Sequence, residues 1–186
     1  TKDSDNQGGL QADVEQHILK SLKRYSLVKD APSVIFVNSK ISKQNIQDAL
    51  GDVYTQAQNA DEFLENESKA YWVMVNEKEF ASLIEELIKA RTDFISCTNN
   101  VFVYILHPEE AVIQDLLRYI TVSRSRFIYM NLFVENEEKF KEKYPYDSAE
   151  MILDNCRLVF ECNANKIETV SYKSGGESET IKYEND

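Results

Sequence analysis

Glycine and proline are scarce in this chain, at 5 and 3 of 186 residues. This scarcity excludes collagen-like and linker-rich proteins, and it argues against an all-β architecture with many tight turns. No apolar run approaches the roughly 20 residues that a membrane-spanning helix requires. We therefore expect no direct membrane insertion within residues 1–186.

Cysteine and histidine are also rare. The three cysteines, Cys97, Cys156 and Cys162, form no CxxC pair and are odd in number, so free thiols are expected rather than a disulfide framework. The two histidines, His17 and His107, are far apart in the sequence and form no HxxxH motif. Their spacing predicts no zinc site, and the sequence assigns no metal and no cofactor.

Basic residues are outnumbered by acidic ones, 21 against 32, which gives a formal net charge of -11. An acidic surface repels the phosphates of nucleic acids and anionic lipid headgroups. Two basic clusters, at 20–24 and 118–126, interrupt this pattern, but each is explained by a helix on which cations interact favourably with the dipole. We therefore predict no nucleic-acid partner.

The chain does contain a fourfold recurrence, in which a short apolar run ends in a polar residue and a helical pattern follows at once. The four runs lie at residues 34–37, 71–75, 101–106 and 128–134. This alternation predicts an α/β fold with a mainly parallel sheet, of Rossmann-like or flavodoxin-like architecture. Because the run at 101–106 is apolar throughout, we expect it to form a central strand covered on both faces.

The pattern predicts a single α/β domain over residues 10–186, preceded by a flexible polar tether at 1–9. Within the domain, an amphipathic helix is expected at 10–28 and the βα core at 33–156. The rhythm changes after the core, and residues 157–186 are expected to form an antiparallel hairpin extension, or meander.

Two of the expected helices follow the first and the third apolar runs. The helix after the first strand is predicted over 42–58, with Gly51 inside it. The helix after the third strand is predicted to begin at Pro108, because proline suits the first helical position. Its buried stripe is expected to include Val112 and Ile113.

Ligands bind open α/β sheets beyond the carboxyl ends of the strands, so the residues that follow the apolar runs are the ligand-binding candidates. These are Asn38, Ser39, Asn76, His107, Glu109 and Glu135. The turn after the first strand has no glycine, which argues against a phosphate cradle. The alternative interpretation is that these polar and acidic residues cap helices and occupy their first turns.

His107 follows the expected central strand, where an imidazole that titrates near neutral pH would be useful. The alternative is a histidine that precedes a proline at a helix cap. No GxSxG motif and no matched nucleophile and base are present, so no catalytic residue is predicted. Acidic side chains also follow the strands, and a Mg²⁺ or Ca²⁺ site built from them is an open alternative; they are Glu77, Glu109, Glu110, Glu135 and Glu137.

Three functional hypotheses follow. The first is a non-catalytic protein-binding or assembly module with a degenerate Rossmann-like fold, in which an apolar helical stripe contacts a protein partner; that stripe consists of Leu10, Val14, Ile18 and Leu22. The alternative for this stripe is that it completes the core of the chain itself. The second hypothesis is an enzyme with an acidic divalent-metal site at the strand carboxyl ends.

The third hypothesis is a soluble domain of a membrane-anchored or exported protein whose anchor was removed. In that case the domain is tethered to a membrane or envelope through a segment upstream of Thr1; otherwise it is expected in the cytoplasm. The sequence does not set the oligomeric state.

Overall fold

The computed structural model describes residues 15–24, 31–38, 42–51, 53–65, 70–75, 77–91, 99–144, 148–156, 158–163, 166–174 and 177–182. Two sheets are present. The first is five-stranded and parallel, in the order β2-β3-β1-β4-β5. Its strands are β1 (Ser33–Val37), β2 (Thr55–Gln56), β3 (Ala70–Val75), β4 (Val101–Leu106) and β5 (Ile128–Phe133). The predicted α/β class and mainly parallel sheet are confirmed.

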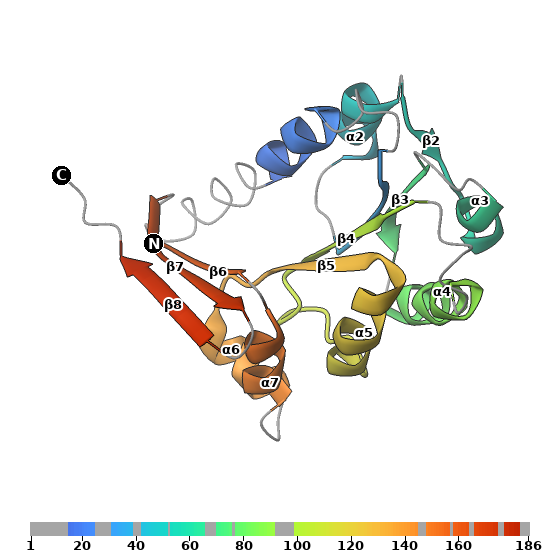
Figure 1. Cartoon of the computed structure of the whole chain (residues 1–186). Coiled ribbons are helices and arrows are strands. Elements are labelled where there is room, and N and C mark those ends of the chain that lie inside the picture. Colours follow the sequence, from blue (N-terminus) through green and yellow to red (C-terminus); the bar gives the residue numbers. More distant parts are fainter. Residues whose placement is uncertain are drawn as a thin grey trace.

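Helices cover both faces of the five-stranded sheet (Figure 1). The helix at 15–24 and α2 (Lys43–Leu50) lie on one face. The opposite face carries α4 (Glu77–Ala90) and α5 (Leu116–Ser123), and a short 3-10 helix, η2 (Arg124–Arg126), follows α5. The smaller helices are α3 (Ala60–Glu65), α6 (Glu137–Lys143) and α7 (Ser148–Asn155).

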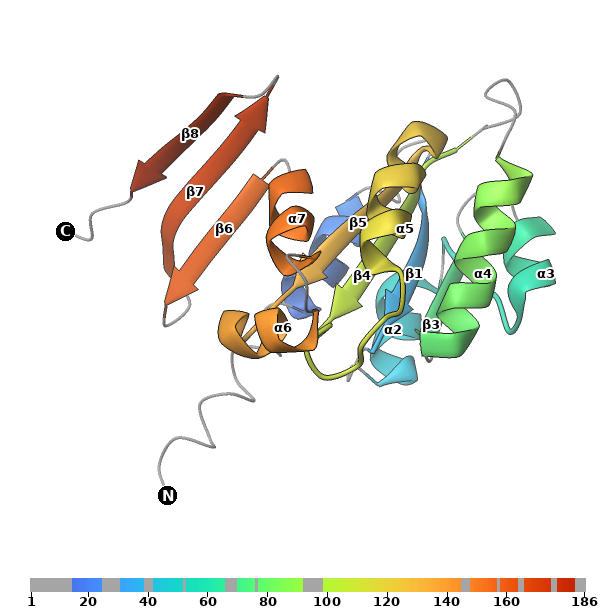
Figure 2. The ribbon, with the colours of Figure 1, turned by 90° about the horizontal axis from the view of Figure 1, so that it is seen from below.

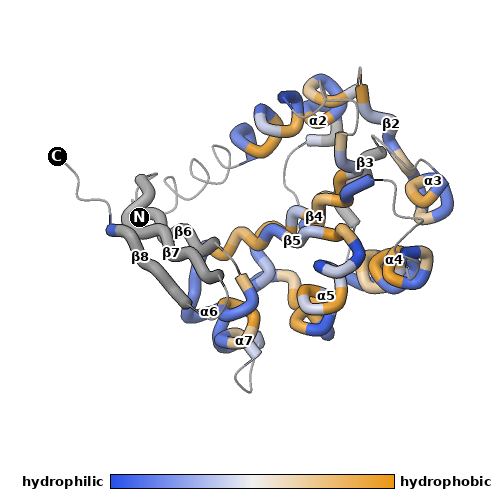
Figure 3. The backbone as a smooth tube through the Cα atoms, in the orientation of Figure 1, coloured by the Kyte–Doolittle hydropathy of each residue, from blue (hydrophilic) through white to orange (hydrophobic). Residues whose placement is uncertain are grey.

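The two faces of the sheet enclose two hydrophobic clusters, and β4 contributes to both. Val103 and Ile105 belong to the cluster beneath α4 and α5, whereas Tyr104 and Leu106 belong to the cluster beneath the helix at 15–24 and α2. This alternation follows from the two-residue period of a strand. The prediction of a central strand covered on both faces is confirmed. Figure 3 shows hydrophobic and hydrophilic residues alternating along α4 and α5, as expected for helices that cover a sheet.

The chain reverses its direction of travel across the sheet at β1. From β1 it moves through β2 and β3 on one side, and it then crosses to β4 and β5 on the other side. Val37 aligns with Ile105 in the β1–β4 ladder, and Leu106 aligns with Phe133 in the β4–β5 ladder. The residues that follow β1, β4 and β5 therefore emerge at one edge of the sheet.

The second sheet is antiparallel, in the order β6-β7-β8, and confirms the predicted meander. It consists of β6 (Leu158–Asn163), β7 (Lys166–Ser174) and β8 (Glu177–Lys182). This sheet lies beyond α6 and α7, apart from the five-stranded sheet (Figure 2). Among the described residues, no helix combines the length and apolar character needed to cross a bilayer.

The predicted helix over 42–58 is wrong in its second half, since α2 ends at Leu50. Gly51 is the C-cap of α2 rather than an interior residue, and its N–H donates to the carbonyl of Gln47. The chain then turns into β2, which pairs with β3 through Thr55 and Gln56. The apolar residues at 53–57 suit a helical period, but this pairing with a distant strand overrides it.

The helix predicted to begin at Pro108 is also wrong in its first half, since α5 begins at Leu116. His107 and Asp115 both have positive φ, of 50° and 59°, and the intervening residues form turns. The N–H of Ile113 donates to the hydroxyl of Tyr144 instead of to a helical carbonyl. Val112 is consequently 43% exposed, whereas Ile113 is buried as predicted.

Candidate metal centre

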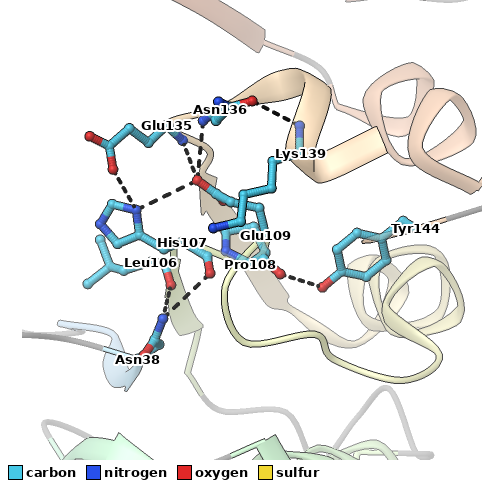
Figure 4. Close-up of polar contacts among 9 residues, drawn as sticks. All are labelled: Asn38, Leu106, His107, Pro108, Glu109, Glu135, Asn136, Lys139 and Tyr144. Carbon is cyan, nitrogen blue, oxygen red and sulfur yellow. Dashed lines mark hydrogen bonds and ion pairs between the residues drawn. The ribbon is translucent and has the colours of Figure 1, made fainter. Parts of the chain in front are cut away.

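Three potential metal ligands meet where β4 and β5 end (Figure 4). His107 directly follows β4, Glu109 lies two residues later, and Glu135 lies two residues beyond the end of β5. One ligand atom from each of these side chains lies within 4.8 Å of the other two. The register of the parallel strands brings them together, although 26 positions separate the two glutamates in the sequence.

Glu109 is almost fully buried, at 2% exposure. Its Oε1 accepts hydrogen bonds from the backbone N–H groups of Glu135, at 2.9 Å, and Asn136, at 3.2 Å. These bonds hold the carboxylate across the loop that precedes α6. Its other oxygen, Oε2, is buried and has no hydrogen-bond partner among the residues that the structure describes.

The imidazole of His107 faces both carboxylates, with its side chain only 7% exposed. Nδ1 lies 3.3 Å from Oε2 of Glu135 and 3.7 Å from Oε1 of Glu109. Both distances are within the range of an ion pair, but neither contact is a hydrogen bond. Nδ1 is buried and has no hydrogen-bond partner in the described part of the chain. Since a buried unsatisfied polar group costs about 1–3 kcal/mol, two such atoms on neighbouring side chains require an explanation.

Asn38 joins the end of β1 to this site. Its side-chain Nδ2 donates to the carbonyl of Leu106 at 2.9 Å, and it lies 3.5 Å from the carbonyl of His107. Asn38 and His107 both occupy the left-handed region, with φ of 56° and 50°. Open α/β sheets bind ligands where the strand order reverses. That point lies between β1 and β4, and the site at the ends of β4 and β5 adjoins it through Asn38.

Tyr144 supports the loop that carries Glu109. Its buried hydroxyl donates to the carbonyl of Pro108 at 3.1 Å and accepts from the N–H of Ile113 at 3.0 Å. Burial raises the pKa of Tyr144, and the hydrogen bond from Ile113 partly offsets this effect. The hydroxyl therefore remains a neutral donor and acceptor that fixes both ends of the turn.

The separation between the His107 and Glu135 ligand atoms fits a shared metal ion. With ligand distances of about 2.0–2.2 Å, two ligands of a tetrahedral metal lie about 3.3–3.6 Å apart. Nδ1 lies 3.3 Å from Oε2 of Glu135, within this range, and 3.7 Å from Oε1 of Glu109, the oxygen that also accepts the two backbone N–H groups. An imidazole nitrogen favours Zn²⁺ and other first-row transition ions over Mg²⁺ and Ca²⁺, while two carboxylates are compatible with Mn²⁺ and Fe²⁺.

The structure brings four of the six predicted ligand-binding residues together, namely Asn38, His107, Glu109 and Glu135. Ser39 and Asn76 lie outside the described residues. The other acidic candidates lie outside this cluster: Glu77 and Glu137 begin α4 and α6, where Glu137 pairs with Lys141, and Glu110 is exposed. The first-turn interpretation suits Glu77 and Glu137.

Sequence reasoning did not identify Tyr144, since a tyrosine at the end of a short helix gives no functional signal. No zinc site was predicted, because the two histidines are far apart in the sequence and the cysteines form no CxxC pair. The cluster instead combines one histidine with two glutamates from different loops. The feature of the sequence that did point to this cluster is the His107-Pro108-Glu109 segment directly after an apolar strand.

The helical stripe proposed for a partner lies partly in the core. Ile18 and Leu22 are buried, with 4% and 0% exposure, in the cluster that contains Phe36 and Leu50. This is the packing that the alternative interpretation predicted for the stripe. Leu10 and Val14 lie outside the described residues.

No family model matches the chain, and neither the curated proteins nor the solved structures include one that is significantly similar to it.

Proposed function

We propose that this protein binds a first-row transition-metal dication, of the Mn²⁺, Fe²⁺, Co²⁺ or Zn²⁺ class, between His107, Glu109 and Glu135. One observation carries the proposal. Nδ1 of His107 and Oε2 of Glu109 are buried, lie in one cluster and lack hydrogen-bond partners among the described residues. Metal ligation satisfies both atoms at once, and Glu135, whose Oε2 lies 3.3 Å from Nδ1, supplies the third ligand.

The charges of the cluster favour a cation. Glu109 is buried and Glu135 is 31% exposed at its side chain, so two carboxylates share a site with limited solvation. A dication between two carboxylates and a neutral imidazole gives a net charge of zero, which offsets the cost of burying Glu109. The two N–H donors on Oε1 then fix the carboxylate from behind, as outer-shell hydrogen bonds do in metal sites.

The site supports catalysis better than a purely structural role. Structural zinc sites are closed by four protein ligands, whereas catalytic sites have three and keep a position for water or substrate. Among the residues that the structure describes, the cluster offers three ligands, and the partial exposure of Glu135 gives solvent access to them. We therefore favour a metal-dependent enzyme in which the metal activates a water molecule or polarises a substrate oxygen.

The strand order is part of this proposal. The run β3-β1-β4-β5 corresponds to the first four strands, 2-1-3-4, of the flavodoxin-like order 2-1-3-4-5, with β2 added at one edge. In that architecture the ligand lies beside the strand at which the order reverses, which here is the edge with Asn38 and His107. The non-catalytic assembly module stays a prediction, and burial of Ile18 and Leu22 leaves it with less support.

Thermal melts and calorimetric titrations of the chelator-treated protein with Mn²⁺, Zn²⁺, Mg²⁺ and Ca²⁺ test the proposal. Mn²⁺ and Zn²⁺ should bind at one site, and Mg²⁺ and Ca²⁺ much more weakly, because the imidazole is a poor ligand for hard cations. A metal present at 100 times its Kd stabilises the folded state by about 2.7 kcal/mol. For a chain of this length that stabilisation raises Tm by roughly 5–11 °C.

Glu135→Gln is the decisive variant, since Glu135 is the most exposed of the three ligands and its replacement leaves the buried contacts intact. The proposal expects this variant to lose the metal-dependent rise in Tm. Glu142→Gln is the matched control, because Glu142 is an exposed residue of α6 outside the cluster, and it should bind as the wild type does. Absence of saturable binding to the wild type, or unchanged affinity in Glu135→Gln, overturns the proposal.

A further inference from the structure

Asn38 follows β1, whereas the three proposed ligands follow β4 and β5, and its side chain reaches across to the end of β4. Nδ2 donates to the carbonyl of Leu106 at 2.9 Å and lies 3.5 Å from the carbonyl of His107. Figure 4 shows the amide directed at both oxygens, on the side of His107 away from Glu109. The contact joins residues 69 positions apart at the point where the strand order reverses.

The two carbonyls flank the backbone of one residue. The Leu106 carbonyl belongs to the peptide group that precedes His107, and the His107 carbonyl belongs to the peptide group that follows it. Rotation about φ of His107 moves the following peptide group relative to the preceding one. Rotation about ψ changes the orientation of the following peptide group. One amide in contact with both oxygens therefore restrains φ and ψ of His107 together.

This restraint matters because the conformation of His107 is unfavourable for most residues. Its φ of 50° is in the left-handed region, where Cβ approaches the following carbonyl oxygen. Asn38 itself has a φ of 56°, which asparagine tolerates better than most side chains. Left-handed residues thus follow both β1 and β4, and the amide of Asn38 adds to the backbone hydrogen bonds that His107 makes with Phe133 and Glu110.

The direction of Cβ at His107 decides where the imidazole lies. With φ at 50°, Nδ1 lies 3.3 Å from Oε2 of Glu135. Relaxation of His107 towards negative φ would swing its side chain away from the two carboxylates. Given the metal site proposed above, on which this inference rests, we infer that Asn38 is a positioning residue that aims Nδ1 of His107 at the metal.

Three variants separate the hydrogen bond from the backbone and from general packing. Asn38→Gly removes the amide but allows positive φ, whereas Asn38→Ala removes the amide and disfavours positive φ. The matched control is Asn131→Ala. Asn131 in β5 likewise donates its amide to a β4 carbonyl, that of Val103, at a position away from the site.

The measurements are Mn²⁺ affinity by calorimetry and the visible absorption of bound Co²⁺, which reports on coordination geometry. Asn38→Gly should bind Mn²⁺ roughly 10–100-fold more weakly, as expected when an outer-shell contact is lost, with an altered Co²⁺ spectrum. Asn131→Ala should retain the wild-type affinity and spectrum. A purely structural role for Asn38 would lower Tm without changing the Co²⁺ spectrum.

The outcomes separate this inference from the proposed function. If the wild type binds Mn²⁺ and Asn38→Gly binds it with the same affinity and Co²⁺ spectrum, the positioning role is overturned while the metal site stands. Equal losses in Asn38→Gly and Asn131→Ala also overturn it, because any amide bond to β4 would then suffice. Absence of binding to the wild type overturns the metal site and the positioning role together.

Discussion

Replacement of Tyr144 by phenylalanine removes a single oxygen atom that the structure places at the centre of the Glu109 loop. The hydroxyl donates to the carbonyl of Pro108 and accepts from the N–H of Ile113. Tyr144 is 7% exposed, so water does not readily replace it. Phenylalanine preserves the ring packing against Phe140, whose centroid is 4.7 Å away, and only the two hydrogen bonds are lost.

The expected loss of stability follows from those two bonds. Each contributes about 1 kcal/mol net, and a backbone group left buried and unsatisfied costs about 1–3 kcal/mol. We therefore expect Tyr144→Phe to lower the free energy of unfolding by about 2–4 kcal/mol. At roughly 2–4 °C for each kcal/mol in a chain of this size, Tm should fall by about 5–15 °C.

Urea denaturation of the metal-free protein measures this loss. The midpoint should shift to lower urea while the m-value stays constant, because the surface exposed on unfolding does not change. Tyr129→Phe is the control, since Tyr129 is 40% exposed, and it should stay within about 0.5 kcal/mol of the wild type. A loss below about 0.5 kcal/mol in Tyr144→Phe, at constant m, would refute the structural role assigned to this hydroxyl.

Two further predictions concern other buried and capping groups. Burial raises the pKa of Tyr54 to about 12 from an ordinary value near 10. Between pH 10 and 12 the unfolded chain therefore ionises this group first, and stability should decline by up to about 1.4 kcal/mol per pH unit. Tyr54→Phe should be at least as stable at pH 7, because the hydroxyl has no hydrogen-bond partner among the described residues, and urea midpoints from pH 7 to 12 should show a shallower alkaline loss. Parallel pH profiles for the two proteins would contradict this. Asn136→Ala should cost about 1 kcal/mol in urea melts, because Oδ1 of Asn136 accepts from the N–H of Lys139 as the N-cap of α6; an unchanged midpoint would count against that cap.

Local patterns predicted most of the individual elements. The helix α4 follows from the spacing of Phe80, Leu83, Ile84 and Leu87, all of which are buried. The strand β4 follows from an uninterrupted apolar run between turn residues. Where prediction failed, at Gly51 and at Pro108, a distant partner decided the conformation: β3 for the residues after α2, and Tyr144 for the turn before α5.

The members of the candidate cluster were each predicted as candidates, but their grouping into one cluster was not. His107, Glu109 and Glu135 were each identified because they follow apolar strands, and the strand ends do meet at one edge. Their mutual approach was beyond prediction, because it depends on β4 lying between β1 and β5. The order of the strands in a sheet cannot be predicted from the hydrophobic periodicity of any single segment.

The sequence by itself determined the α/β class, the composition of each buried face and the general edge at which a site would lie. These properties depend on residue spacings of two to four positions, which are set by the geometry of strands and helices. The tertiary structure alone decided that Asn38 reaches the backbone of His107 and that His107 faces Glu135. Those contacts span tens of residues and exist only because the chain reverses direction at β1, which places the ends of β1, β4 and β5 side by side.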